Sequence, residues 1–328
     1  MINRRLCLAA ATTLAPLPRA ARAQADYPTR PLTLVVGYPP GGSTDLVART
    51  FGAELAKRLG QTVIIDNSSG AGGALAAQKV AQAAPDGYTL LLGASNEMAI
   101  NRLITPALRY DSQRDFTPIG LVATQAMLLV AAPHTRVKTL DEFIALVKSK
   151  PGRFNYGSSG NGTALHLAGE MIKQSAELFM VHIPYRGVAP LTNDLLGGQL
   201  DFGIFVLSSG LPHVRSGKLT ALGLTEARRS PSAPEIPALS EHPALRKVNI
   251  NVWFGLFAPA RLPEAVTGRL RAAYAEAIGA PELRRKLDEA GARVTMPGAE
   301  PADKLLAGYL KVETEKYSRV VDFAKIKE

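Results

Sequence analysis

Two short glycine-rich stretches say most about this chain: Pro39-Pro40-Gly41-Gly42-Ser43-Thr44-Asp45 and Tyr156-Gly157-Ser158-Ser159-Gly160-Asn161-Gly162-Thr163. Each lies between an apolar, strand-like run and a helix-like run. Glycine lets the backbone turn with its N–H groups exposed, and the helix start that follows adds unpaired donors and a partial positive charge. Such a loop can receive an anionic oxygen, and two of them in separate halves of the chain predict a small anion held from both sides.

Turn and capping chemistry explains glycine and serine at such positions equally well, so that interpretation stays open for each stretch. Nucleotide motifs are lacking, because neither stretch continues into Gly-Lys-Ser/Thr and Gly70-Ala71-Gly72-Gly73-Ala74-Leu75 ends in leucine where a dinucleotide fingerprint needs a small residue. Asn161 stands where a serine nucleophile elbow needs glycine. The sequence therefore predicts no catalytic residue, no metal and no cofactor.

Residues 1–25 have the pattern of an export signal. Arg4-Arg5 precede a mostly apolar run over Leu6–Leu17, and small-x-small cleavage sites follow near Ala23 and Ala25. The run is too short to span a bilayer. The twin arginine fits the Tat route loosely, and an ordinary Sec signal is favoured. We therefore expect a mature periplasmic protein that starts near residue 24 or 26.

The cysteine count and the charge distribution limit the kinds of chemistry and partner that the chain can have. Cys7 is the only cysteine and lies in the expected signal, so the mature chain would have no disulfide and no thiol chemistry. Loss of the four signal arginines would lower the net charge from +10 to +6. The remaining basic residues are scattered rather than gathered in one stripe, which argues against a nucleic-acid partner and suits an acidic ligand.

Strand-like and helix-like runs alternate along the chain. A chain of this length is expected to form two domains, and the alternation predicts a parallel sheet covered on both faces. The expected strands are 32–38, 62–65, 88–92, 154–156, 179–183, 200–206, 219–224 and 251–258. The expected helices are 46–59, 74–84, 140–149 behind a Thr139–Glu142 capping box, 163–175, 188–196, and two or three from residue 263 onward.

A series of short segments also runs in a fixed order through nearly the whole chain: Tyr27–Pro31, Pro39–Asp45, Gly70–Gly73, Ala84–Leu90, Asp115–Ile119, Asn155–Thr163 with His166, Pro184–Gly187, Leu195–Asp201 and Trp253–Gly255. Together they resemble the periplasmic solute-binding proteins of tripartite tricarboxylate transporters, the Bug family. The resemblance implies an α/β, two-lobed periplasmic-binding-protein fold (Venus flytrap, type II-like). One lobe would span 26–123 plus 251–328, the other 124–250, with a ligand cleft between them.

The resemblance also implies ligand contacts at matching positions. Tyr38 would cover the ligand, and Ser95 and Asn96 would form the cleft floor. Asp45 has an alternative role as a helix cap, and Arg186 could pair with a carboxylate or remain solvated. The expected contacts are a first jaw (Gly42, Ser43, Thr44, Asp45), a second jaw (Ser158, Ser159, Asn161, Gly162, Thr163) and a third loop (Arg186, Gly187).

Two departures from the family pattern bear on the ligand. Gly37 stands where the family commonly has proline. Phe205 and Val206 stand where many members have a polar pair containing aspartate, which would suit the ammonium of an amino acid. The resemblance therefore predicts a plain or aromatic carboxylate near Phe205 rather than an amino acid.

The expected partners are a mono-, di- or tricarboxylate and the small and large membrane subunits of a transporter, with the binding protein itself a monomer. One alternative is a sensor whose closed form meets a membrane receptor. A second is a metal-dependent enzyme acting on carboxylates, since His166 and Glu170 are four residues apart on an expected helix. No second ligand pair accompanies them in the sequence, so the enzyme is less favoured.

Overall fold

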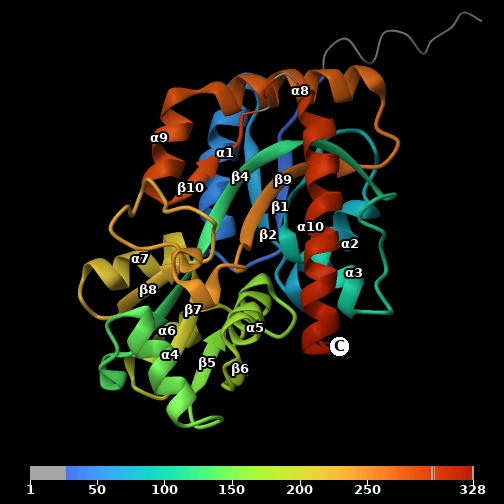
Figure 1. The fold of residues 1–328 in the computed structure, drawn as a ribbon. Helices are drawn as coiled ribbons and strands as arrows, with labels where there is room; N and C mark the ends of the chain where they lie inside the picture. The colour runs from blue at the N-terminus through green and yellow to red at the C-terminus, as the bar shows by residue number, and fades with distance from the viewer. Residues whose placement is uncertain (1–26, 297, 299, 327–328) are drawn as a thin grey trace, which may run out of the picture.

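A computed structural model describes residues 27–296, 298 and 300–326, and the expected export signal lies outside these residues. The described strands form one curled, ten-stranded sheet in the order β2-β1-β3-β9-β4-β7-β5-β6, with β8 and β10 each paired to β4. Figure 1 shows two parts. The first lobe contains β1, β2, β3, β9 and β10, the second contains β5 to β8, and β4 runs through both.

The strands are β1 (Leu32–Val36), β2 (Val63–Asn67), β3 (Thr89–Ala94), β4 (Phe116–Ala131), β5 (Asn155–Ser158), β6 (Val181–Pro184), β7 (Phe202–Val206), β8 (Thr220–Leu224), β9 (Asn251–Pro259) and β10 (Ala292–Val294). The α-helices are α1 (Ser43–Leu59), α2 (Ala74–Ala81), α3 (Asn101–Ile104), α4 (Leu140–Ser149), α5 (Ala164–Ala176), α6 (Val188–Leu196), α7 (Leu207–Arg215), α8 (Glu264–Gly279), α9 (Pro281–Glu289) and α10 (Ala302–Ala324). Short turns of helix are η1 (Ala71–Gly73), η2 (Asn96–Ile100), η3 (Pro133–Thr135), η4 (Leu239–Glu241) and η5 (Pro243–Leu245).

The prediction of a parallel sheet was wrong for the middle of the molecule. β1 is parallel to β2 and β3, and β5 is parallel to β6 and β7, but β9 and β4 run antiparallel to their neighbours. The reason is the long strand β4, which the sequence analysis did not predict. Its residues up to Ala126 pair with β9, and from Met127 onward they pair with β7 and β8. The chain therefore passes between the lobes along β4.

Helix starts follow local capping chemistry. α1 begins at Ser43, three residues before the predicted Leu46, because the N-cap is Gly42. Thr139 caps α4 as predicted, since its side chain accepts the N–H of Glu142 at 3.2 Å. The Glu142 carboxylate accepts the N–H of Lys138 rather than that of Thr139, so the capping box closes one residue early. Ser43, Thr44 and Asp45 thus belong to the first turn of a helix rather than to a loop.

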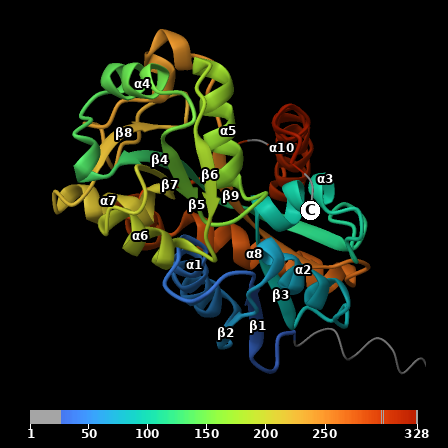
Figure 2. The same cartoon turned by 90° about the horizontal axis from the view of Figure 1, so that it is seen from below.

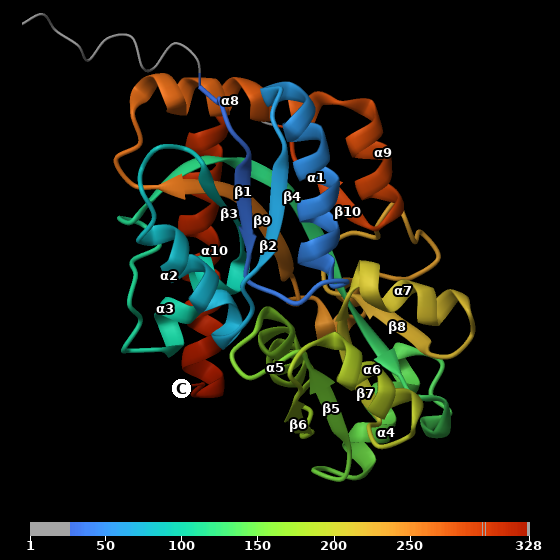
Figure 3. The same ribbon diagram turned by 180° about the vertical axis from the view of Figure 1, so that it is seen from behind.

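One main hydrophobic core extends through both lobes and includes the fully buried rings of Phe51, Phe143, Trp253 and Tyr274. A smaller cluster in the second lobe contains Leu128 and Phe205. Figures 1 and 3 show α8 across the far end of the first lobe and α10 along its side, with the end of α10 near α5. No helix among the described residues has both the length and the apolar character to cross a membrane.

Candidate functional site

The predicted contact loops lie at the carboxyl ends of parallel strands. The first jaw follows β1 and the floor residues follow β3, while the second jaw begins at the last residue of β5 and the third loop follows β6. Carboxyl ends of neighbouring parallel strands share one edge of a sheet, where open α/β sheets bind ligands. Figures 2 and 3 show the loop before α1 facing α6 and α7 of the second lobe.

The first jaw presents unused backbone donors. Gly42, with φ −82° and ψ 175°, is the N-cap of α1 and has no side chain to cap the helix. The first hydrogen bond of the helix runs from Leu46 N–H to Gly42 O at 3.0 Å. The N–H groups of Ser43 and Thr44 precede it, so they lack partners within the helix and carry the positive end of its dipole.

Asp45 holds this loop in place. Its buried carboxylate accepts hydrogen bonds from Gly41 N–H at 3.0 Å, from Arg49 Nε at 2.9 Å and from Asn67 Nδ2 at 3.0 Å. Burial opposes its ionisation, but these donors outweigh burial and lower the pKa of Asp45. Asp45 is therefore not the helix cap, which is Gly42, but its carboxylate ties the loop before α1 to the first turn of that helix.

The second jaw uses its hydroxyl groups internally. Ser158 Oγ lies 2.7 Å from His182 Nε2 and donates to Gly160 O at 3.0 Å. Thr163 is the N-cap of α5, where its hydroxyl accepts the N–H of His166 at 3.3 Å and donates to Gly160 O at 2.8 Å. Even Gly162 N–H is engaged, since it donates to His166 Nδ1 at 3.1 Å. These contacts shape the loop.

The remaining predicted residues of the second lobe are more accessible. Asn161 and Arg186 are exposed, and Ser159 is half-buried. Gly187 is the N-cap of α6 with φ 101°, a conformation that favours glycine, and its N–H donates to Ser159 O at 3.3 Å. Within the described part of the chain, no salt bridge involves Arg186.

One side chain of the cleft floor joins the lobes directly. Asn96 Oδ1 accepts the N–H of Ala164, the first residue of α5, at 2.9 Å. Asn96 Nδ2 donates to the hydroxyl of Tyr38 at 2.8 Å, and this hydroxyl lies 3.1 Å from Glu97 Oε2. Ser95 is fully buried beside them. The structure thus brings Tyr38 and the floor residues to the start of the second-lobe helix α5.

Glu97 was not predicted from the sequence, although it directly follows the floor pair Ser95-Asn96. Its carboxylate is buried and accepts Ala94 N–H at 2.7 Å. Burial raises the pKa of Glu97 to about 7, against the opposing hydrogen bonds from backbone N–H groups and Tyr38. An acidic residue directly after a buried strand was the available signal for it.

His182 was also missed. Its ring stacks on His166 with the centroids 3.7 Å apart, directly under the second jaw. Burial lowers the pKa of His166 to about 4 and that of His182 to about 3, so both are neutral at physiological pH. Glu170 pairs with Lys173 at 2.8 Å and lies 3.8 Å from His166 Nε2. No cluster of three or more His, Cys, Asp or Glu suited to a metal occurs among the described residues.

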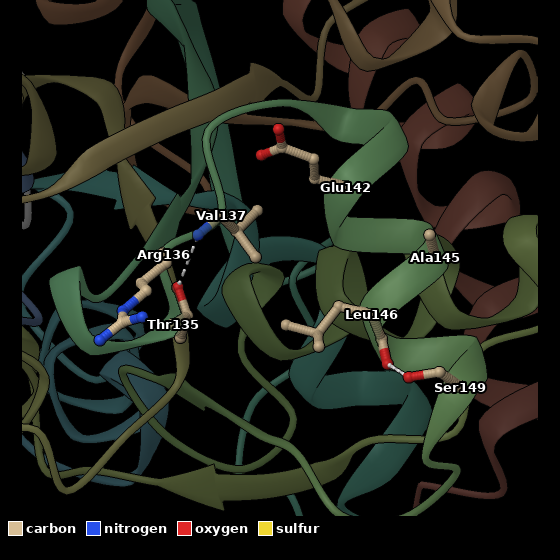
Figure 4. Close-up of a pocket in the computed structure, with 7 residues that line it drawn as sticks. All are labelled: Thr135, Arg136, Val137, Glu142, Ala145, Leu146 and Ser149. Atoms are coloured by element: carbon tan, nitrogen blue, oxygen red, sulfur yellow. Dashed lines mark hydrogen bonds between the residues drawn. The ribbon is translucent and has the colours of Figure 1, made fainter.

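Phe205 belongs to β7, which pairs in parallel with β5, the strand that leads into the second jaw. Its ring is fully buried in the smaller cluster, opposite Leu128 in the β4–β7 register. The second lobe also has a surface pocket of about 430 Å³, which lies between Thr135–Val137 and α4 (Figure 4). Hydroxyls of this pocket are satisfied locally, because Thr135 donates to Ala132 O and Ser149 donates to Leu146 O, each at 2.7 Å. None of the predicted contact residues lines this pocket.

The fold and the two facing jaws define a two-lobed solute-binding protein. The chain belongs to the TctC family, the tripartite tricarboxylate transporter family receptors, whose profile matches residues 47–319. The predicted family and fold class are confirmed. Members of this family are periplasmic solute-binding proteins rather than enzymes.

Individual relatives support the assignment to this family. A UPF0065 protein in the tcbD-tcbE intergenic region of Pseudomonas sp. (strain P51) is 34% identical over 295 residues, which is 90% of this chain and 86% of the relative. Rpa4515 of R. palustris, solved with adipate, superposes with TM-score 0.86 at 31% identity and covers 92% of this chain and 99% of its own. MatC of Rhodopseudomonas palustris, solved with bound malate, gives TM-score 0.81 at 34% identity, covering 90% and 100%.

Proposed function

We propose that this chain captures a small mono-, di- or tricarboxylate between its lobes and delivers it to the membrane subunits of a tripartite tricarboxylate transporter. The observation that carries the proposal is the start of α1, where the N–H groups of Ser43 and Thr44 have no partner within the helix, in a lobe that Asn96 joins to the start of α5 in the other. Helix N-termini favour anionic oxygens through their free donors and their dipole. Adipate and malate in two relatives support this ligand class.

The proposed lobes are residues 26–123 with 251–328, and 124–250. The first jaw would bind one carboxylate mainly through backbone N–H groups, and Ser159, Asn161 and Arg186 would meet the ligand from the second lobe. Asp45, Ser158 and Thr163 would stabilise the shape of the jaws without forming a hydrogen bond to the ligand. We place the mature protein in the periplasm as a monomer, released from a signal at residues 1–25.

A screen of purified mature chain tests the proposal. Malate, adipate, succinate, citrate and benzoate are added separately, and the melting temperature is followed, because a ligand of the native state raises it. Calorimetry then measures Kd, with the corresponding amides as uncharged controls. Binding of a carboxylate but not of its amide is expected. If amides and amino acids bind as well as the acids do, the carboxylate proposal is wrong.

A further inference from the structure

The feature that carries a further inference is the place where the chain crosses between the lobes. β4 changes partners between Ala126 and Met127, and the chain returns to the first lobe where β9 begins at Asn251. Thr225, directly after β8, lies between these two crossings and is fully buried. We call Met127, Thr225 and Ile250 the crossing junction.

Thr225 makes hydrogen bonds to both crossings. Toward β4, its N–H donates to Met127 O at 2.9 Å, and its hydroxyl accepts Met127 N–H at 3.1 Å. Toward β9, its carbonyl accepts Ile250 N–H at 3.0 Å, and its hydroxyl donates to Ile250 O at 2.6 Å. A hydroxyl can donate and accept at once, so this one side chain joins the two crossing segments to each other.

The neighbours of the junction belong to opposite lobes. Leu224 pairs with Leu128 inside the second lobe. Asn251 is held in the first lobe by α10, because Tyr317 donates to Asn251 O at 3.1 Å and Tyr309 donates to Asn251 Oδ1 at 3.2 Å. Any rotation of one lobe against the other must therefore be absorbed between these two anchored positions, which is where the Thr225 hydroxyl sits.

We propose that Thr225 is a positioning residue for ligand binding: its hydroxyl fixes the relative orientation of the lobes, so it controls affinity without touching a ligand. The proposal rests on the proposed capture between lobes. With the hydroxyl present, the jaws meet in few orientations, and little conformational freedom is lost on binding. Without it, Met127 N–H and Ile250 O lose their side-chain partner, and the lobes sample more orientations.

The test compares Thr225→Val, which keeps the shape and removes the hydroxyl, with Thr225→Ser, which keeps the hydroxyl. Thr267→Val is the matched control, because Thr267 is also a buried threonine whose hydroxyl donates to a backbone carbonyl, Pro263 O at 3.1 Å, but within the first lobe. Spin labels on cysteines introduced at the exposed Ala53 of α1 and Ala145 of α4 report the interlobe distance. The native mature chain offers no competing cysteine.

Thr225→Val is expected to broaden the distance distribution of the free chain, while Thr225→Ser and Thr267→Val keep the native width. For malate or adipate, whichever binds the native chain, Thr225→Val should weaken Kd about three- to tenfold, with Thr225→Ser restoring it. If Thr225→Val does not fold, Thr225→Ala, which leaves space for a bridging water, replaces it.

Native distances and native Kd in the folded Thr225→Val protein would overturn the proposal. So would an equal broadening in Thr267→Val, since that would reflect lost stability rather than a lost junction. The distance measurement needs no ligand. Failure of both carboxylates to bind the native chain would therefore count against the proposed function alone, while the role of Thr225 would still be decided by the distance distribution.

Discussion

The two jaws look alike in sequence and differ in how they use their polar groups. In the first jaw, the Asp45 carboxylate stabilises the loop by accepting Gly41 N–H. The N–H groups of Ser43 and Thr44 have no partner within the helix. In the second jaw, Ser158, Thr163 and His166 satisfy one another and the loop backbone. Similar glycine–serine composition therefore produces one loop with spare donors and one that is largely closed on itself.

The comparison shows that hydroxyls are poor guides to ligand contacts until their partners are known. A hydroxyl that already donates to a backbone carbonyl adds little to a ligand, since binding would first break that bond. Free backbone N–H groups at a helix start have no such competing partner. We therefore expect the first jaw to dominate affinity and the second jaw to contribute mainly through shape.

The largest expected effect comes from added bulk at Gly42. The space around a Cβ there is open, since the nearest atom, Pro39 O, is 3.7 Å away, and the φ of −82° suits any residue. Gly42→Val should therefore fold, yet cover the free donors and weaken carboxylate binding by more than about 100-fold, or about 2.7 kcal/mol. Calorimetry measures the affinity, and the melting temperature verifies folding.

Gly162 provides the contrast within that experiment. Its φ of +64° strains any other residue, so Gly162→Ala should lower the melting temperature, whatever it does to the ligand. Gly279→Val, which adds bulk in open space at the end of α8, is the control for an added side chain away from the jaws. Retained binding in Gly42→Val would mean that the first jaw is not the anion site.

The next effect concerns what holds each jaw. Asp45→Asn places an amide among three donors, from Gly41, Arg49 and Asn67, so one of them must lose its acceptor. The expected loss is about 1.5–3 kcal/mol in unfolding free energy, with weaker binding because the start of α1 loosens. Glu170→Gln, which alters the buried carboxylate near the second jaw, should destabilise the protein while changing affinity less. Denaturant unfolding and calorimetry on both variants test the difference.

A smaller effect is the pH dependence of stability, which has opposite signs for the two histidines under the second jaw and for Glu97 beside the cleft floor. The unfolded histidines bind protons near pH 6.5, whereas folded His166 and His182 do so at about 4 and about 3, so stability falls as the pH drops below 6.5. Glu97 is the reverse. Its folded pKa of about 7 exceeds the unfolded value of about 4.3, so its contribution is full below the unfolded value and is lost as pH rises to 7.

The two histidines outweigh Glu97 between about pH 4.3 and 7, so stability should rise with pH through that range and level off near pH 7. Each proton taken up changes the slope by about 1.4 kcal/mol per pH unit. Melting temperatures measured from pH 4 to 9 test this, with Glu97→Gln as the variant that removes the opposing contribution and should make the rise between about pH 5 and 7 steeper. An equally shallow rise in that variant would mean that another group opposes the histidines.

Elements with local capping and periodicity signals could be predicted from the sequence, whereas elements and roles that depend on tertiary contacts could not. α5 was placed within one residue, because the Thr163 cap and the apolar spacing lie in the same short segment. β4 was missed, since its course depends on pairing with β9, more than a hundred residues away. The jaws were found as loops, but the roles of Glu97 and His182 arise only from tertiary contacts with Tyr38 and Ser158.

The smallest expected effect comes from comparing two adjacent serines of the second jaw. Ser158 and Ser159 are adjacent, but the Ser158 hydroxyl is buried against His182 and Gly160, whereas Ser159 is half-buried at the surface of the loop. Ser158→Ala should therefore cost stability, and Ser159→Ala should instead cost about 0.5–1.5 kcal/mol of carboxylate binding, the value of one hydrogen bond. Unfolding and calorimetry on both variants separate the two quantities. If Ser158→Ala weakened binding and left stability intact, its hydroxyl would turn to the ligand when one binds, and the second jaw would supply a second hydroxyl donor beside Ser159.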